Sequence, residues 1–240
     1  MMIPANITPP AHVHFRGRGF TLVELLVCVA VIAVLAGIIT SIARGTMVKA
    51  RAIECSAKLK SLGAATLLYS QEHQEQFPRS FHSAGAHREP GWAASIAPYL
   101  GADPAEIETH WERVFQTYFR SPADKATDPF IYSYALNVHF ELDPDGDDYT
   151  GSPATWRRLH QVPSPGSTIL MGQPKAVKFG DHLMCHQWTG IQAAKNALNH
   201  EIHGGKANYL FVDGHVETLR VEETFDPSHK INRWNPSLAK

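Results

Sequence analysis

Apolar residues dominate the chain from residue 20 to residue 42, and no charged side chain occurs between Glu24 and Arg44. An α-helix rises about 1.5 Å per residue, so about 20 helical residues cross the roughly 30 Å hydrocarbon core of a bilayer. The segment is therefore long enough to span a membrane. No proline occurs between residues 20 and 72, which predicts that one helix continues to about residue 72.

Beyond residue 45 the apolar positions form a helical stripe. They recur at alternating spacings of four and three residues, which places them on one face of a helix that we expect to pack against a sheet. The stripe comprises Val48, Ala52, Cys55, Leu59, Leu62, Thr66 and Tyr69. A break into two helices near Gly45 is the alternative, since glycine disfavours helix by about 1 kcal/mol.

Shorter elements follow this helix. Residues 93–100 and 105–119 are predicted to be helical, the second with Asp103 as N-cap and Pro104 in its first turn. Residues 141–166 are predicted to be a long loop.

The remaining elements are predicted strands and a loose tail. Alternating apolar positions rich in β-branched and aromatic residues predict strands at 131–140, 168–171, 207–212 and 215–220. Asp213 and Gly214 separate the last two strands, and we expect a type I′ hairpin turn there. The tail from Phe225 is expected to pack loosely. The sum is an α+β fold with a long helix against a small antiparallel sheet.

Composition and charge indicate a globular domain and argue against a nucleic-acid-binding protein. The chain is 44% apolar, 10% aromatic and 19% charged, as globular domains are. Its net charge is −1, so no basic field indicates nucleic acid as a partner. Loss of residues 1–19 would remove Arg16 and Arg18 and shift the charge to −3, from 20 basic against 23 acidic residues.

Three interpretations of the N-terminal apolar segment compete. The first is a secretory signal, which has an apolar region of about 7–15 residues followed by a small-x-small cleavage site. The apolar segment of this chain is longer than such a region. An ordinary single-pass anchor fits the length but does not explain Glu24. A carboxylate in a membrane helix costs a few kcal/mol and usually marks a function.

Residues 19–24, which read Gly-Phe-Thr-Leu-Val-Glu, resemble the type IV prepilin signature. The resemblance implies that a membrane peptidase cuts after Gly19 and that Phe20 is then methylated, so that Glu24 becomes the fifth residue of the mature chain. It also implies that the Glu24 carboxylate neutralises the new ammonium of a neighbouring subunit inside an assembled fibre. A buried charge requires such a partner.

A second resemblance involves both ends of the soluble part. Residues 54–63 are similar to a large bacterial prepilin-like family whose members carry a histidine, nine residues and then Asp-Gly near the C-terminus. Here these are His203, Asp213 and Gly214. Members often have Cys-Pro where residues 121–122 of this chain read Ser-Pro.

The resemblance implies a pilin-like roll made of three parts: a leader at 1–19, a transmembrane and assembly segment at 20–43, and an extracytoplasmic domain at 44–240. The expected place is the cytoplasmic membrane, crossed once, or a pilus or pseudopilus of a type IV pilus-like or type II secretion machine. The implied partners are the prepilin peptidase, the inner-membrane assembly platform, further copies and related pilin-like subunits.

Charges alone leave the orientation open. Arg16 and Arg18 favour a cytoplasmic N-terminus, whereas Arg44, Lys49 and Arg51 beyond the apolar segment favour the opposite. The outward position of the soluble domain therefore rests on the resemblance.

Candidate chemical sites are few. A strand between His203 and Asp213, at about 3.3 Å per residue, would hold the two apart, so we expect loop and turn roles and no joint catalytic site. His182, Cys185 and His186, or His200 with His203, would suit zinc on a helix, but no helical stripe surrounds them, and exposed histidines are the simpler interpretation.

No cofactor is expected, and calcium is the alternative. Its ligands would come from four clustered carboxylates, Asp143, Asp145, Asp147 and Asp148. The resemblance to type II secretion pseudopilins, which carry a calcium site, supports this candidate. The segment is no EF-hand loop, because its twelfth position is Ala154, and a solvated acidic loop is the preferred interpretation.

The cysteines leave a disulfide open, and no catalytic motif is found in the sequence. Cys55 and Cys185 would form one disulfide in an oxidising compartment or remain free thiols. No phosphate-binding loop and no Gly-x-Ser-x-Gly motif occurs, so no enzyme is expected. A binding or cargo-recognition protein that uses a pilin anchor is the alternative function, since residues 141–166 and 173–205 are long loops of the kind that carry recognition.

Overall fold

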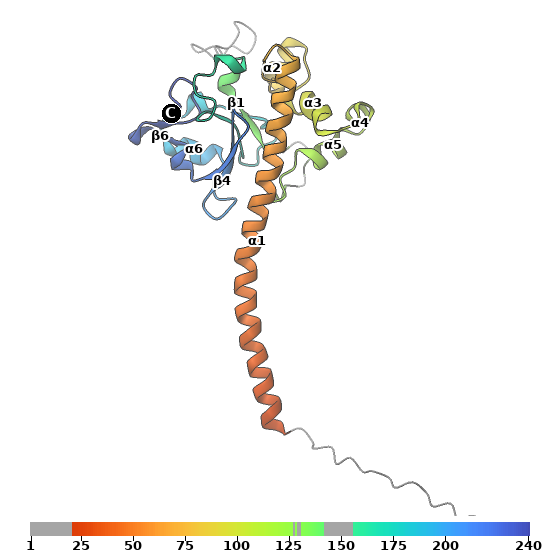
Figure 1. Cartoon of the computed structure of the whole chain (residues 1–240), viewed down its shortest axis with the longest axis vertical. Coiled ribbons are helices and arrows are strands. Elements are labelled where there is room, and N and C mark those ends of the chain that lie inside the picture. The colour runs from red at the N-terminus through yellow and green to blue at the C-terminus, as the bar shows by residue number, and fades with distance from the viewer. Residues whose placement is uncertain (1–20, 127, 129–130, 142–155) are drawn as a thin grey trace, which may run out of the picture. The chain divides into compact units, whose positions relative to one another are not determined.

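The structure is a computed structural model that describes residues 21–126, 128, 131–141 and 156–240 (Figure 1). The chain divides into two compact units, Met1–Gly45 and Thr46–Lys240. The calcium candidates Asp143, Asp145, Asp147 and Asp148 lie outside the described residues.

The first element, α1 (Leu22–Glu72), is one uninterrupted helix, so the predicted long helix is confirmed and the break near Gly45 is not observed. A glycine costs about 1 kcal/mol in a helix, which is little for a helix of 51 residues. Within the second unit Cys55, Leu59 and Leu62 are fully buried, which confirms the stripe.

Four short helices follow α1: α2 (Phe81–His87), α3 (Trp92–Ile96), α4 (Pro104–Thr109) and α5 (Trp111–Tyr118). Asp103 caps α4 as predicted, because its Oδ1 accepts a hydrogen bond from Ala105 N at 2.8 Å. The predicted helix 105–119 is split at His110, whose φ of −135° and ψ of 42° are not helical.

The main sheet has five strands in the order β3-β1-β2-β4-β5. These are β1 (Ala135–Asn137), β2 (Ile169–Gly172), β3 (His182–Leu183), β4 (Ala207–Phe211) and β5 (Val216–Leu219). All pairs are antiparallel except β3, which runs parallel to β1, so the sheet is mixed. The predicted strand 131–140 is observed only as β1, because residues 138–140 form a 3-10 helix. The Asn137 side chain caps this helix by accepting a hydrogen bond from His139 N.

The remaining elements are short. They are the 3-10 helices η1 (Ala97–Leu100), η2 (Val138–Phe140), η3 (Leu159–Gln161), η4 (Cys185–Gln187), η5 (Val221–Glu223) and η6 (Pro227–His229), the helix α6 (Ile191–Ala197), and the strands β6 (Phe225–Asp226) and β7 (Ile231–Asn232), which pair with each other.

The sheet is buried on both faces. Leu210 of β4 belongs to one apolar cluster with residues of α1, α3 and α5, and its neighbours Tyr209 and Phe211 belong to a second cluster with α6 and the C-terminal tail. Figure 1 shows the α1 segment of this unit beside the sheet, with α3, α4 and α5 near it. A strand covered on both faces reads as a nearly continuous apolar run, as residues 207–212 do.

The tail is part of the core, so the prediction of loose packing is wrong. Phe225, Trp234 and Ala239 are buried. The Trp234 ring packs edge-on against Tyr209, with ring centroids 5.9 Å apart, and against Trp188 at 5.2 Å. The aromatic residues on the second face of β4 need a cover, and the tail supplies it.

We expect Trp234→Ala to lower the free energy of unfolding by about 3–5 kcal/mol, because it empties a fully buried aromatic site. The measurement is urea unfolding of residues 46–240. Leu238→Ala, at an exposed tail position, is the matched control and should change stability by less than about 0.5 kcal/mol. Equal effects of the two variants would contradict the assignment of the tail to the core.

Candidate functional site

The N-terminal end of α1 carries a reciprocal capping arrangement. Thr21 donates from its backbone N and from its Oγ1 to Glu24 Oε2, each at 2.9 Å, and Glu24 N donates back to Thr21 Oγ1 at 3.2 Å. This is the capping box formed by Thr-x-x-Glu at a helix start. Gly19 and Phe20, the predicted processing site, lie outside the described residues.

This arrangement leaves Glu24 with capacity to bind. Both hydrogen bonds from Thr21 end on Oε2, so neither uses the second carboxylate oxygen, Oε1. A carboxylate accepts through two oxygens, so Oε1 can take a charge-assisted hydrogen bond from an ammonium. The sequence predicted the importance of Glu24, and the Thr-x-x-Glu spacing is the signal that would have indicated Thr21 as its partner.

The apolar side chains of α1 are exposed within the first unit. Its large apolar side chains, including Leu22, Ile32 and Ile39, are each more than half exposed. Among the described residues α1 is the one helix that is long and apolar enough to cross a membrane. A continuous apolar surface of this length needs lipid or other helices around it.

The structure separates His203 and Asp213, which flank β4. His203 is buried before the strand, and Asn208 Nδ2 lies 3.4 Å from its Nε2. The same Asn208 Nδ2 donates to the carbonyl of Ala52 in α1 at 3.0 Å. His203 thus supports an asparagine that ties β4 to α1, and burial lowers the pKa of His203, which favours its neutral form.

Asp213 and Gly214 form the tip of the β4–β5 hairpin. Phe211 N donates to His215 O and Gly214 N donates to Phe211 O, each at 2.9 Å. In this loop of residues 212–214 only Gly214 has a positive φ, of 90°. The turn is therefore the three-residue type with a left-handed glycine, and the expected type I′ turn is wrong. Asp213 Oδ1 accepts from His215 N at 3.1 Å, which supports this loop.

The residues considered for a zinc site have other contacts, and the expectation of exposed histidines is wrong for His203, which is buried. His182 Nδ1 pairs with Asp181 at 2.9 Å, and Cys185 donates to Asn137 Oδ1 at 2.9 Å. Within the described part of the chain no group of three or more His, Cys, Asp or Glu residues is placed to hold a metal ion.

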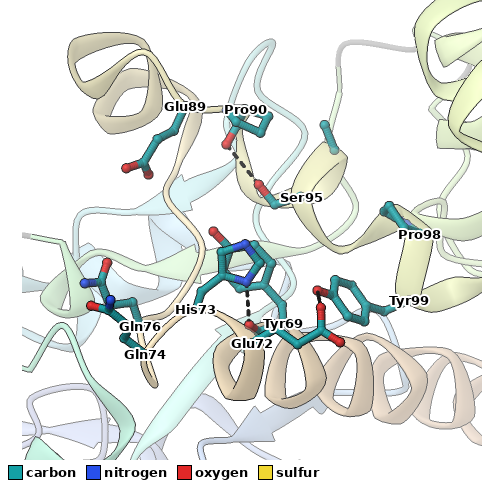
Figure 2. Close-up of a pocket in the computed structure, with 11 residues that line it drawn as sticks. Tyr69, Glu72, His73, Gln74, Gln76, Glu89, Pro90, Ser95, Pro98 and Tyr99 are labelled. Atoms are coloured by element: carbon teal, nitrogen blue, oxygen red, sulfur yellow. Dashed lines mark hydrogen bonds between the residues drawn. The ribbon is translucent and has the colours of Figure 1, made fainter.

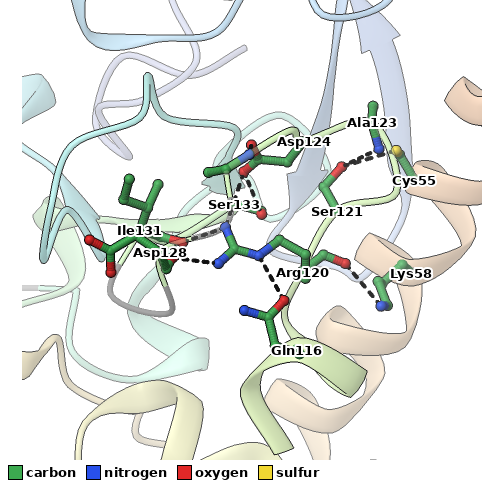
Figure 3. A network of polar contacts seen from close by, with 11 residues as sticks. Cys55, Lys58, Gln116, Arg120, Ser121, Ala123, Asp124, Asp128, Ile131 and Ser133 are labelled. Atoms are coloured by element: carbon green, nitrogen blue, oxygen red, sulfur yellow. Dashed lines mark hydrogen bonds and ion pairs between the residues drawn. The ribbon is translucent and has the colours of Figure 1, made fainter. Parts of the chain in front are cut away.

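The three cysteines are free thiols. Cys55 Sγ lies 3.1 Å from Ser121 Oγ in the buried region between α1 and the segment after α5 (Figure 3). Lys58, one turn further along α1, donates to the carbonyls of Thr117 and Arg120, each at 2.9 Å. A lysine that caps the last carbonyls of a helix holds its C-terminal end in place.

Arg120 extends this network into the loop that precedes β1 (Figure 3). Its guanidinium donates to the carbonyls of Ile131 and Asp128 at 2.8 and 2.7 Å and pairs with Asp124 at 3.5 Å. The network therefore anchors the segment that leads from α5 to the sheet, and with it the position of Ser121 beside Cys55.

Buried carboxylates, which the sequence analysis missed, hold the start of α2. Ser80 N donates to Glu141 Oε1 at 2.6 Å, Ser80 Oγ lies 2.7 Å from Glu141 Oε2, and Phe81 N donates to Asp181 Oδ2 at 2.7 Å. These contacts satisfy backbone N–H groups that a helix start leaves unpaired. Burial raises the pKa of Glu141, and the bonds from Ser80 oppose the shift.

The comparisons with known proteins match two parts of the chain. Residues 15–40 match the family described as the prokaryotic N-terminal methylation motif. Residues 48–114 match a family described as a protein of unknown function (DUF1559). No curated protein and no solved structure matches the chain.

A long apolar N-terminal helix and a small mixed sheet define this α+β protein as pilin-like. The methylation motif spans Gly19, Phe20 and Glu24. The two family matches support a prepilin-type N-terminal methylation protein. The motif implies processing by prepilin peptidase, and α1, the one sufficiently long and apolar helix among the described residues, indicates a single-pass membrane anchor.

We expect Ser121→Cys to form a disulfide with Cys55 under oxidising conditions, since the two side-chain atoms already lie 3.1 Å apart. Closing a loop of this length should raise the free energy of unfolding by about 2–4 kcal/mol. Intact mass without reductant and urea unfolding with and without reductant measure the two effects. In the control, Ser121→Cys combined with Cys55→Ser, neither effect should appear. A reduced thiol pair after oxidation would contradict the observed geometry.

We expect the neutral variant Glu141→Gln to match or exceed the wild type in stability at pH 7. A raised folded-state pKa stabilises the fold below the ordinary value of about 4.5, and this contribution is lost as the pH rises through the raised value. The amide keeps an acceptor for Ser80 N and a donor for Ser80 Oγ. The measurement is urea unfolding from pH 4 to 8.

Glu141→Ala is the comparison for this prediction. It leaves Ser80 N buried without its acceptor and should cost about 1–3 kcal/mol at every pH. If Glu141→Gln were as damaging as Glu141→Ala at pH 7, the glutamate would be ionised in the folded chain and the argument from burial would fail.

Proposed function

We propose that this protein is a pilin-like structural subunit that assembles through its N-terminal helix into a type II secretion or type IV pilus-like fibre. The observation that carries the proposal is the apolar first part of α1, which is exposed along its length and carries Glu24 in its first turn, within the methylation motif. Packed helices of other subunits would cover this surface and remove it from water.

Cleavage after Gly19 would supply the counter-charge that assembly needs. It creates an ammonium on Phe20, four residues before Glu24. In an apolar fibre core an unpaired charge is energetically costly, so each Glu24 would form an ion pair with the ammonium of a neighbouring subunit. The Oε1 atom, which the capping bonds of Thr21 do not use, supports such a contact without loss of the helix cap.

The proposal places the second unit outside the cytoplasm and assigns it no catalysis and no required cofactor. Its partners would be further copies, related pilin-like subunits and the inner-membrane assembly platform. His203 before β4 and the hairpin turn at Asp213 and Gly214 would have structural roles.

We expect Glu24→Ala to abolish fibre assembly and to leave leader cleavage largely intact. The readouts are sheared fibres seen by electron microscopy and the intact mass of the membrane form. Mature wild type and mutant should both begin at Phe20, and the wild type should carry one extra methyl group.

The matched control is Glu54→Ala, which removes an exposed glutamate of α1 beyond the apolar part. It should assemble like the wild type. Normal fibres from Glu24→Ala, or a mature wild-type chain that still begins at Met1 or Met2, would refute the proposal.

A binding or cargo-recognition protein on a pilin anchor is the second candidate function. It is favoured by a cavity of about 860 Å³ at the C-terminal end of α1. Specific capture of a secreted protein or glycan by residues 46–240, with no fibre in the wild type, would support this candidate over the first.

A further inference from the structure

A large cavity lies at the point where α1 ends (Figure 2). Its volume is about 860 Å³, within the range of small-molecule sites. Three segments line it: the last turn of α1 at residues 69–72, the turn at residues 73–76, and residues 89–99 with α3 and η1. All belong to the second unit and none to the apolar part of α1.

Three aromatic rings in fixed orientations form one side of the cavity. Tyr69 and His73 stack with ring centroids 3.8 Å apart and planes 11° apart. Tyr99 stands at 85° to Tyr69 with centroids 6.2 Å apart, and its hydroxyl donates to Glu72 Oε2 at 2.6 Å. Rings held in this way lose little conformational freedom when a ligand packs on them.

Polar groups suited to hydroxyl recognition complete the lining. Gln74 and Gln76 contribute carboxamides, each with two donor hydrogens and an acceptor oxygen. Ser95 contributes a hydroxyl, whose Oγ donates to Pro90 O at 3.0 Å. Figure 2 shows Ser95 and Glu89 on one side of the cavity and the rings of Tyr69 and His73 facing them.

The turn that presents Gln74 is strained. Gln74 and Glu75 have φ values of 56° and 63°, in the left-handed region that favours glycine. Glu75 N donates to Ser70 O at 2.7 Å and Leu159 N donates to Glu75 O at 2.9 Å, so the turn is held from both sides. Strain that the surroundings enforce in this way is typical of functional sites.

The lining excludes several ligand classes. None of the described residues that line the cavity is lysine or arginine, so an anion has no counter-charge there. The two carboxylates already have partners, Glu72 with Tyr99 and Glu89 with Arg79 at 3.0 Å, which weakens their attraction for a cation or metal ion. Aliphatic surface is limited to Ala94 and two prolines, which is little for a lipid chain.

We propose that this cavity binds a neutral saccharide. A sugar ring has an apolar face that can pack on the aromatic rings, and its hydroxyl groups can both donate to and accept from carboxamides, a serine and paired carboxylates. The hydrogen bond from Tyr99 to Glu72 holds the Tyr99 ring in its orientation beside the cavity. The proposal does not depend on fibre assembly.

The test is titration calorimetry on the full chain in a zwitterionic detergent, because glycoside detergents would compete. The probes are the neutral trisaccharides cellotriose, maltotriose and N-acetylated chitotriose, with choline as a cationic probe. We expect at least one trisaccharide to bind. No binding of any of them up to about 10 mM, which corresponds to affinity weaker than millimolar, would overturn the proposal. Binding of choline alone would overturn it as well.

Two glycine variants locate the site. Gln74→Gly and Glu75→Gly both relieve a positive φ, but only Gln74 lines the cavity, whereas Glu75 pairs with His160. We expect Gln74→Gly to weaken trisaccharide binding at least fivefold with no loss of stability, and Glu75→Gly to leave affinity within twofold of the wild type. Equal affinity of all three proteins, or equal weakening by both variants, would overturn the assignment to this cavity.

Discussion

The second unit depends on the close approach of α1 to the β4–β5 hairpin. A Cβ atom added to Gly63 would lie 2.6 Å from Leu210 Cδ1, and one added to Gly214 would lie 3.1 Å from Leu67 Cδ1. Glycine at these two positions therefore leaves room for the leucine side chains of the facing element, which an added Cβ atom would have to displace. The cluster that includes α3 and α5 forms on the same face of the sheet, so it rests on this contact.

One helix serves two environments. In the first unit the apolar side chains of α1 are exposed on all sides, whereas in the second unit one stripe that includes Leu59 and Leu62 is buried in the core. The backbone hydrogen bonds of a helix are internal and suit both surroundings. Folding of the globular unit and burial of the apolar segment thus use different residues of one element.

Local signals predicted the elements that local chemistry determines. The long helix, the cap at Asp103 and the hairpin at Gly214 follow from periodicity, capping residues and turn residues. The prediction of a loose tail failed because its order comes from distant partners, with Trp234 against Tyr209. The aromatic and apolar run at 207–212 did carry a signal that both faces of the strand need a cover.

The candidate sites divide in the same way. Glu24 was predictable because a carboxylate at the head of an apolar helix is costly, and its partner Thr21 lies only three residues away. Glu141 holds Ser80 across 61 positions of sequence, and the rings of Tyr69 and Tyr99 meet across 30. No periodicity or motif links such residues, because the fold alone brings them together.

The burial of Trp234 and Ala239 has a consequence for the biosynthesis of this chain. The second face of the sheet gains the cover of Trp234 and Ala239 only when these residues have been synthesised, so the core around β4 is incomplete until then. N-terminal segments of a growing chain usually begin to fold first. Here α1 is synthesised early, whereas the sheet that packs on it is fully covered only after residues 234–239 follow, so helix formation and closure of the core are separate steps in time.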